Sequence, residues 1–435
     1  MKVRDIVLFA LVLATPLSHA APAATKKKKK PAAAAVSQQA RANAERIVSK
    51  ELAKSNNVEN PGSLVPFYEQ LYREKTGQSH GAVHILHFGD SHTAADEWTG
   101  SLRDLFQASF GDGGPGFSLA GHPFRGYRRF DVSGGGSSGW HTEGLARAEG
   151  DGFYGLGGVS ISTDRPGETA YISAECNLLE VFYLQQPGGG SLAFYDNGER
   201  TAEIATNGEA GPGYFSYKPS PGTHSFELRT VENAPVRLFG WAADRARGVT
   251  YEALGINGAE AAVIFKWDEK TLASNLEHRN PALIVLAYGT NEAGSPSWDY
   301  DSYERMFSSL LARLRQYAPT ASILVVGPPD RYYRLRRGPM QPLEKVTDII
   351  AAQREACREN GAAFWDTRTR MGGKGSMRQW VTAGLAQHDY VHFLGQGYRL
   401  LGNTLFKDVM RNYDDFVKAR ESSAESAGVG NQPPQ

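Results

Sequence analysis

A serine in a chemically promising position occurs early in the chain, at Ser91. Residues 83–88 form an apolar run that predicts a buried β-strand, and the segment Gly89-Asp90-Ser91 follows it directly. This order places the hydroxyl at the carboxyl end of a strand, where open α/β sheets bind their ligands. A serine becomes a good nucleophile only when a base takes its proton, so the sequence must also provide one. Without a base, the polar residues here would simply cap the following helix.

A base, and an acid that could orient it, lie near the other end of the chain. Asp389 and His392 are three residues apart, just before Gly395, where a helix is expected to begin. His392 would take the proton of Ser91 through Nε2 and return it to the leaving alcohol. Asp389 would bind the other ring nitrogen and fix the tautomer. The three residues together predict a serine hydrolase.

Acyl transfer by a serine also needs hydrogen-bond donors for the negative charge that develops on the substrate oxygen. Asn291 follows a second strand-like run, residues 283–287, and lies in a turn that contains glycine. The backbone N–H of Ser91 is the second expected donor. The third is a backbone N–H in a glycine-rich segment, where we select Gly258, although spacing alone leaves Gly255 open.

The elements that must bring these residues together alternate between helical and strand-like patterns. A further strand is expected at residues 323–326, and helical periodicity is expected in residues 64–75, 98–110, 303–317 and 343–360. Such alternation predicts a mostly parallel sheet covered by helices on both faces. The carboxyl ends of parallel strands meet at one edge, so Ser91 and Asn291 can converge there.

Residues 112–247 differ in composition from the rest of the chain. They are rich in glycine and aromatic residues, with short alternating runs such as residues 178–184 and 223–230. Turn signals such as Asp196-Asn197-Gly198 separate these runs. Because helical patterns resume afterwards, we expect an antiparallel β-sandwich inserted into an α/β domain that is formed by residues 62–111 and 248–412.

Four short motifs in this order resemble those of the SGNH (GDSL-type) hydrolase superfamily, which carries a serine, a glycine, an asparagine and an Asp-x-x-His pair. The matching residues here are Ser91, Gly258, Asn291, and Asp389 with His392. The resemblance implies a flavodoxin-like three-layer α/β fold. It also implies ester hydrolysis through an acyl-enzyme, with no cofactor and no metal.

Within that superfamily, the sequence is similar to the bacterial peptidoglycan O-acetylesterases. His92 stands where leucine more commonly follows Gly-Asp-Ser, and a Gly-Asp-Gly-Gly-Pro-Gly segment begins at Gly111. That branch also carries a β-sandwich similar to a carbohydrate-binding module between its serine and glycine motifs. The resemblance covers roughly residues 64–412. It implies an acetylated glycan, most directly peptidoglycan, as the partner.

The two ends of the chain have distinct compositions. Residues 1–20 combine a charged start, a short apolar core and a small-residue cleavage site, which predicts a secretory signal peptide. The apolar core is too short to span a bilayer, so we expect a periplasmic or otherwise exported protein with no transmembrane segment in the mature chain. Residues 21–61 predict a Lys/Ala-rich linker and a polar helix, and residues 413–435 predict a disordered tail.

The charge of the chain is balanced, with 47 Lys and Arg against 47 Asp and Glu in 435 residues. This gives no sign of the basic face that nucleic-acid binding requires. His84 and His87 are an odd number of residues apart on a predicted strand, so they point to opposite faces and do not predict a metal site. Cys176 and Cys357 could pair in an oxidising compartment, but such sparse usage favours two separate buried thiols.

The most direct interpretation is an exported serine carbohydrate esterase that removes O-acetyl groups from peptidoglycan. Two alternatives use the same mechanism: deacetylation of another envelope or extracellular polysaccharide, and acetyl transfer between sugars. An alternative of a different class is a non-catalytic glycan-binding protein. The intact set Ser91, Asn291, Asp389 and His392 favours an enzyme.

Overall fold

The computed structural model describes residues 36–55, 58–146, 150–334 and 338–429. The elements discussed below belong to the unit Gln38–Gln435. The predicted signal peptide, residues 1–20, and most of the Lys/Ala-rich linker lie outside the described residues. The polar helix expected after the linker is α1 (Gln38–Leu52).

A parallel sheet forms the centre of the α/β part. Its five strands lie in the order β13 (Val249–Gly255), β1 (Val83–Gly89), β14 (Leu283–Ala287), β15 (Ser322–Val326) and β18 (Ala363–Trp365). Every neighbouring pair in this sheet is parallel. Numbered along the chain, the strand order is 2-1-3-4-5, which is that of flavodoxin-like folds, and the order reverses between β1 and β14. The predicted flavodoxin-like α/β fold is confirmed.

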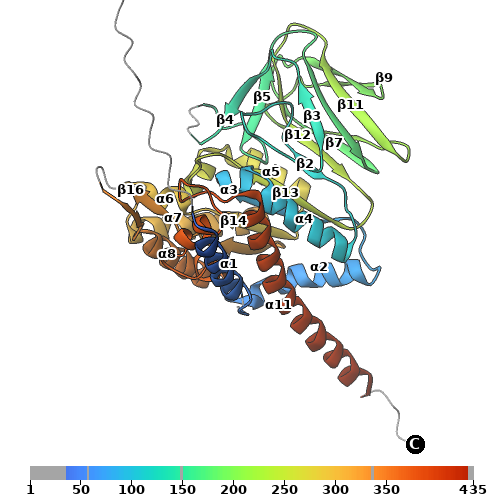
Figure 1. The fold of residues 1–435 in the computed structure, drawn as a ribbon. Helices are drawn as coiled ribbons and strands as arrows, with labels where there is room; N and C mark the ends of the chain where they lie inside the picture. Colours follow the sequence, from blue (N-terminus) through green and yellow to red (C-terminus); the bar gives the residue numbers. More distant parts are fainter. Residues whose placement is uncertain (1–35, 56–57, 147–149, 335–337, 430–435) are drawn as a thin grey trace, which may run out of the picture. The chain divides into compact units, whose positions relative to one another are not determined.

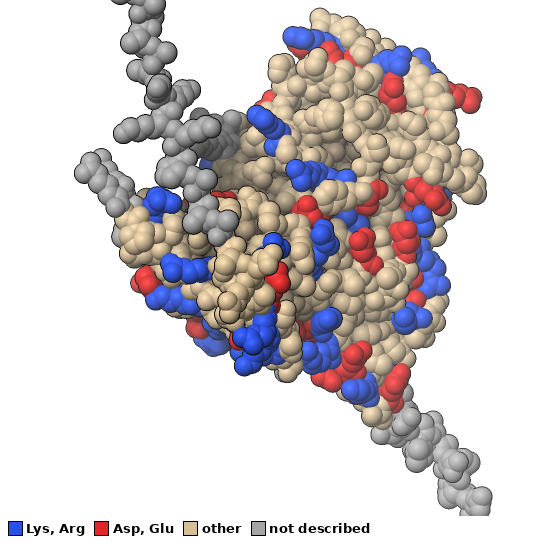
Figure 2. Space-filling model, in the orientation of Figure 1, with Lys and Arg blue, Asp and Glu red and all other residues tan. Residues whose placement is uncertain are grey.

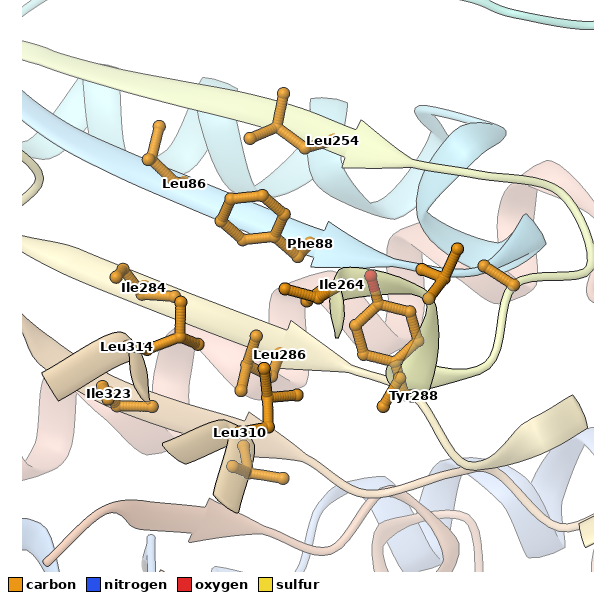
Figure 3. Close-up of a cluster of buried hydrophobic side chains, with 14 of the residues drawn as sticks. Leu86, Phe88, Leu254, Ile264, Ile284, Leu286, Tyr288, Leu310, Leu314 and Ile323 are labelled. Carbon is orange, nitrogen blue, oxygen red and sulfur yellow. The ribbon is translucent and has the colours of Figure 1, made fainter. Parts of the chain in front are cut away.

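Apolar side chains on both faces of these strands explain why helices cover both sides of the sheet. In β1, Ile85 packs into one apolar cluster, whereas Leu86 and Phe88 pack into another. Figure 3 shows the second cluster, in which Leu310 and Leu314 lie against the strands. Because successive side chains of a strand point to opposite faces, a strand that is buried on both faces is apolar at most positions. This near-continuous apolar run is typical of a parallel sheet.

Two groups of helices form the outer layers (Figure 1). The cluster that contains Ile85 also takes side chains from α2 (Val65–Lys75), α4 (Glu97–Phe110) and α11 (Gly395–Val429). The opposite cluster takes side chains from η2 (Ala261–Lys266), α5 (Glu269–Arg279), α7 (Tyr300–Tyr317) and α8 (Val346–Glu359). The remaining short elements are η1 (Pro61–Leu64), α3 (Ser91–Ala94), α6 (Thr290–Gly294), α9 (Thr367–Arg370), α10 (Met377–Thr382), β16 (Tyr332–Arg334) and β17 (Met340–Pro342).

The strands between Gly116 and Asp244 form the inserted sandwich, drawn mainly in green in Figure 1. One sheet has the order β10 (Gly211–Tyr217), β7 (Leu178–Gln185), β12 (Val236–Asp244), β5 (Val159–Thr163) and β4 (His141–Gly144), with β2 (Gly116–Ser118) also paired to β12. The other has the order β3 (Ser133–Gly136), β6 (Thr169–Glu175), β11 (Thr223–Thr230), β8 (Ser191–Asp196) and β9 (Glu199–Ala205). All pairs are antiparallel, as predicted.

The insert has its own core and also shares one with the parallel sheet. Between its two sheets, Val181 and Leu238 meet Phe194 and Phe226. Other insert side chains, including Phe117, Leu156, Phe182 and Phe239, pack in the same cluster as Phe88 of β1 and Leu254 of β13. A buried ion group joins the two parts as well, because Arg279 of α5 pairs with Asp244 of β12 and Glu252 of β13.

The disordered tail expected from residue 413 onward is wrong over most of its length, because α11 continues to Val429. Tyr413 stacks edge-on against Tyr68 of α2, and Phe416 also contacts that ring, so apolar packing extends the helix beyond the predicted end. Residues 430–435 lie outside the described residues.

Three general properties concern the described residues as a whole. None of their helices has both the length and the apolar composition needed to cross a membrane. Cys176 and Cys357 are both buried and unpaired, as favoured by the sequence. On the face shown in Figure 2, basic and acidic side chains are intermixed.

Candidate active site

Ser91 begins α3, directly after the tight turn that ends β1. Gly89 ends the strand where a Cβ would come within 2.2 Å of the Thr93 hydroxyl, so the turn requires glycine. The buried carboxylate of Asp90 then caps α3 by accepting a hydrogen bond from the N–H of His92 at 2.9 Å. This places Ser91 at the first position of the helix, where a backbone N–H has no partner within the helix. The residue lies at the carboxyl end of β1, beside the point where the strand order reverses.

The structure brings the three predicted catalytic side chains together. Ser91 Oγ lies 2.9 Å from His392 Nε2, and His392 Nδ1 lies 2.7 Å from Asp389 Oδ2. A carboxylate accepts only, so Nδ1 carries the hydrogen and Nε2 is left to accept the serine hydrogen. This is the tautomer that a general base for Ser91 requires.

Local backbone contacts hold Asp389 in position. Its Oδ1 accepts hydrogen bonds from the N–H groups of Val391 and His392, at 2.9 and 3.0 Å, which closes a short turn around the acid. Tyr390 takes the left-handed backbone conformation that this turn needs. Partial burial acts to raise the pKa of Asp389, but the hydrogen bond from His392 and the two N–H groups hold it below its usual value. The acid is therefore ionised when His392 becomes protonated.

His92 is buried directly behind His392. Its Nδ1 lies 2.8 Å from the hydroxyl of Tyr398 in α11, and its ring centroid is 5.2 Å from that of His392. Burial, together with the nearby His392, lowers the pKa of His92 to about 3, so the ring stays neutral at ordinary pH. The residue that replaces the usual leucine is thus an uncharged support for His392.

The two glycines left open by the sequence have different surroundings. A Cβ on Gly255 would come within 2.1 Å of the Ala94 nitrogen, so this glycine allows β13 to pack against α3. Gly258 has φ 75°, and apart from its own atoms and its chain neighbours no atom of the described residues lies within 4 Å of a would-be Cβ, so it lies beside open space. The adjacent Asn257 lines the same pocket as Ser91. These surroundings favour Gly258 as the oxyanion donor.

Asn291 is the second residue of α6, which follows β14 after a short turn. Its Nδ2 donates one hydrogen bond, 2.8 Å long, to the carbonyl of Ala259. A side-chain amide carries two N–H groups, so this bond uses only one of them. The bond links Asn291 to the turn that contains Gly258, and the two predicted donors are thereby held on neighbouring segments.

Glu292 is a further residue of this site that the sequence interpretation did not single out. It is fully buried, and its carboxyl group accepts from Ala261 N at 2.8 Å and from Gly289 N at 2.9 Å. It therefore ties the Gly258 turn to the Asn291 turn. Burial raises the pKa of Glu292 to about 8. A glutamate directly after the motif asparagine, at the end of a buried strand, is the signal that could have identified it.

An open pocket of about 380 Å³ gives access to the serine and histidine. Its wall includes Ser91 and His392, together with Glu97 and Tyr398 from the α/β part. Arg128 also lines it, although this residue belongs to the insert. Within the described residues, no group of three or more His, Cys, Asp or Glu is arranged to hold a metal ion.

Comparison with known proteins agrees with this geometry. Residues 223–400 match the model of the GDSL-like lipase/acylhydrolase family, a range that includes Gly258, Asn291, Asp389 and His392 but not Ser91. A solved structure of a peptidoglycan O-acetylesterase is similar over 80% of this chain and 96% of that one, with 26% sequence identity and a TM-score of 0.69. In fold, in motif order and in the arrangement of these residues, the chain resembles the SGNH (GDSL-type) hydrolase superfamily. It is an esterase.

Other solved structures are more distant from this chain. A family two carbohydrate esterase from Cellvibrio japonicus is 11% identical, with a TM-score of 0.27 over 65% of this chain and 98% of its own. A salicylyl-acyltransferase from a tetracycline biosynthetic pathway is 10% identical, with a TM-score of 0.29 over 65% of this chain and 98% of its own. A search of curated proteins finds no match to the sequence.

Proposed function

We propose that this chain is an exported carbohydrate esterase that removes O-acetyl groups from a glycan, most directly peptidoglycan. The observation that carries the proposal is the continuous hydrogen-bonded chain from Ser91 through His392 to Asp389, which opens to a pocket at the strand-order reversal. The likeness to a peptidoglycan O-acetylesterase supports the choice of substrate. Export is supported by the signal-like composition of residues 1–20.

In the first half of the reaction, Ser91 Oγ attacks the carbonyl carbon of the acetyl ester while its proton passes to His392 Nε2. The new Oγ–C bond converts the carbonyl to a tetrahedral oxyanion. When this intermediate collapses, the bond from carbon to the sugar oxygen breaks, and His392 returns the proton to that oxygen. The products are the free sugar hydroxyl and acetyl-Ser91.

In the second half, water takes the place of the sugar. His392 removes a proton from water, the hydroxide attacks the acetyl carbon, and the bond to Ser91 Oγ breaks as the serine regains its proton. Acetate leaves and the triad is restored. Throughout, the carboxylate of Asp389 stabilises the charged form of His392.

The oxyanion is the group that most needs stabilisation in both halves. The N–H groups of Ser91 and Gly258 and the side-chain amide of Asn291 are the proposed donors. The hydrogen bonds from Asn291 to Ala259 and from Ala261 to Glu292 hold these turns in a fixed arrangement before substrate arrives. Such preorganisation avoids reorganisation cost during the reaction.

Acetate release by the purified mature chain tests the substrate. O-acetylated peptidoglycan, acetylated xylan and acetylated alginate are compared at equal acetyl content, with the Ser91→Ala variant as the blank. The proposal expects the highest kcat/KM on peptidoglycan. Preference for another polymer would identify that polysaccharide as the substrate. Acetyl transfer to added sugars that is faster than hydrolysis would identify a transferase. No release from any polymer or aryl acetate would instead favour a glycan-binding protein.

A further inference from the structure

A second groove lies on the sandwich next to the catalytic pocket. It has a volume of about 270 Å³, close to the lower end of the range for small-molecule sites. The loop of residues 124–131, which we call the Arg128 loop, lies between the two hollows. Arg128 itself is exposed and lines both of them. A chain-like substrate that extends from Ser91 past Arg128 would therefore enter this groove.

The walls of the groove combine exposed aromatic rings with polar groups. Tyr171 and Phe130 are 41% and 59% exposed, which is high for large apolar side chains. Ser118 lines the groove with only 3% of its surface exposed, and its hydroxyl has no hydrogen-bond partner among the described residues. A buried hydroxyl without a partner is uncommon, and it costs free energy unless a ligand or water forms the missing hydrogen bond.

Glycines in β3 create room for this groove. Gly135 lies opposite Tyr171 in the antiparallel register of β3 and β6. A Cβ on Gly135 would come within 2.7 Å of the Tyr171 hydroxyl and 2.9 Å of His122 Nε2. The bare backbone lets these two side chains lie over the strand. A flat surface with a ring and nearby polar groups suits a sugar, which has an apolar face and hydroxyls at its edge.

The Arg128 loop is fixed to the α/β part by buried charges. Asp96, five residues after the nucleophile, accepts from the N–H of Phe130 at 2.9 Å and pairs with Arg103 of α4. Arg103 Nε also lies 3.1 Å from the carboxylate of Asp131, which in turn pairs with Arg129. The loop is thus held in register with the turn that carries Ser91, so the groove and the catalytic pocket are aligned before substrate binds.

We infer that this groove is a second glycan subsite, which binds the sugar next to the acetylated one. Tyr171 and Phe130 contact the apolar face of that sugar, and the hydroxyl of Ser118 forms a hydrogen bond with one of the sugar hydroxyls. Arg128, between the two sugars, donates charge-assisted hydrogen bonds to their oxygens or to a carboxylate. The inference takes its substrate class from the proposed function. It adds which part of the insert binds the polymer.

Kinetics on two substrates test the subsite. For Tyr171→Ala and Phe130→Ala, the ratio of kcat/KM on O-acetylated peptidoglycan to kcat/KM on a small aryl acetate should fall about tenfold or more, the size expected for a central aromatic contact. Tyr171→Phe keeps the ring and should retain most of the ratio. Tyr300→Ala removes a similarly exposed tyrosine on α7, outside the groove, and should leave the ratio unchanged. Wild-type ratios in both groove variants would overturn the inference.

A binding measurement separates failure of the subsite from failure of the proposed function. Ser91→Ala protein is titrated calorimetrically with a tetrasaccharide of the peptidoglycan strand that carries no acetyl groups. Binding that weakens at least about tenfold on adding Tyr171→Ala supports the subsite, even if the wild type releases no acetate. No measurable binding, or equal binding with and without Tyr171→Ala, would contradict it. Absence of acetate release from any glycan would instead count against the proposed function.

Discussion

At the level of single residues, the site depends on side chains that hold the reacting groups in place. Asp389 and His92 contact His392 from two directions, one through a hydrogen bond and the other through ring packing. Asn291 and Glu292 cross-link the turns that carry the proposed oxyanion donors. These supporting contacts set the geometry of the groups that are proposed to react.

Asn291→Ala removes one proposed oxyanion donor. Because the donor acts mainly on the charge formed during the reaction, kcat on an aryl acetate should fall by a factor of about 10²–10³, equivalent to about 2.7–4 kcal/mol. Steady-state kinetics check this, with the melting temperature as a control for the lost bond to Ala259. An increase in KM at unchanged kcat would make Asn291 a substrate contact instead.

Glu292→Gln tests the buried carboxyl. With a folded-state pKa of about 8 against an ordinary value of 4.5, the folded state favours the neutral acid. The protonated carboxyl of Glu292 contributes its full stabilisation when the pH is below its ordinary pKa. That contribution is lost as the pH rises toward 8, at up to about 1.4 kcal/mol per pH unit. Urea unfolding should therefore show the wild type losing more stability than Glu292→Gln between pH 6 and pH 8.

The buried Asp90 is coupled to Glu292 in this comparison. Burial raises the pKa of Asp90 to about 6, and its negative charge acts to raise the pKa of Glu292, so the difference between the two proteins reports Glu292 together with this coupling. Parallel stability curves for wild type and Glu292→Gln over this range would mean that Glu292 is ionised in the folded protein.

At the level of elements, the apolar pattern of a short segment predicts the helices and strands that depend mainly on that segment's own residues. The run at residues 83–88 and the helical pattern at residues 98–110 correspond to β1 and α4, because apolar periodicity and buried faces decide both. Asp389 and His392 could be proposed because their turn is local, with the histidine three residues after the aspartate.

Contacts between distant segments could not be read from those patterns. The later part of α11 packs against α2 through Tyr413 and Phe416, a contact that the composition of residues 413–435 does not reveal, so that composition suggested a tail where the structure has helix. The pairing of Arg103 with Asp96 and Asp131 joins α4 to a loop of the insert. Sequence spacing carries no information on such a pairing.

Arg103→Met tests the ion group that holds the Arg128 loop. Arg103 and the carboxylate of Asp96 are almost fully buried, with 2% and 0% of their side-chain surfaces exposed. Loss of the cation leaves Asp96 charged and unpaired, which should lower the free energy of unfolding by about 3–5 kcal/mol in urea titrations. The double variant Arg103→Met/Asp96→Asn should recover part of that loss. A decrease below about 1 kcal/mol for Arg103→Met would mean that the pair is not buried in solution.

At the level of the whole molecule, the insert and the α/β part share a core. Phe182 and Phe239 of the sandwich pack in one cluster with Phe88 and Leu254 of the parallel sheet, and Arg279 pairs with Asp244 across the boundary. Replacing the insert by a short linker would therefore expose apolar surface and leave Arg279 with fewer partners. Point changes in the groove are a cleaner way to separate polymer binding from ester cleavage.

The shared core predicts that the two parts unfold together. Differential scanning calorimetry of the chain without residues 1–35 should give one transition in which the calorimetric and van't Hoff enthalpies agree. Two resolved transitions, or a van't Hoff enthalpy well below the calorimetric one, would show that the sandwich is an independent folding unit.

Acetylation of Ser91 is the most direct test of the central claim, that this serine is the nucleophile of an ester hydrolase. The enzyme is mixed with an aryl acetate, quenched in acid during turnover, digested and examined by mass spectrometry. Wild type should carry one acetyl group on the peptide that contains Ser91. Ser91→Ala should carry none and release no acetate above the uncatalysed rate. Undiminished turnover by Ser91→Ala, or an acetyl group found only on another residue, would contradict the account.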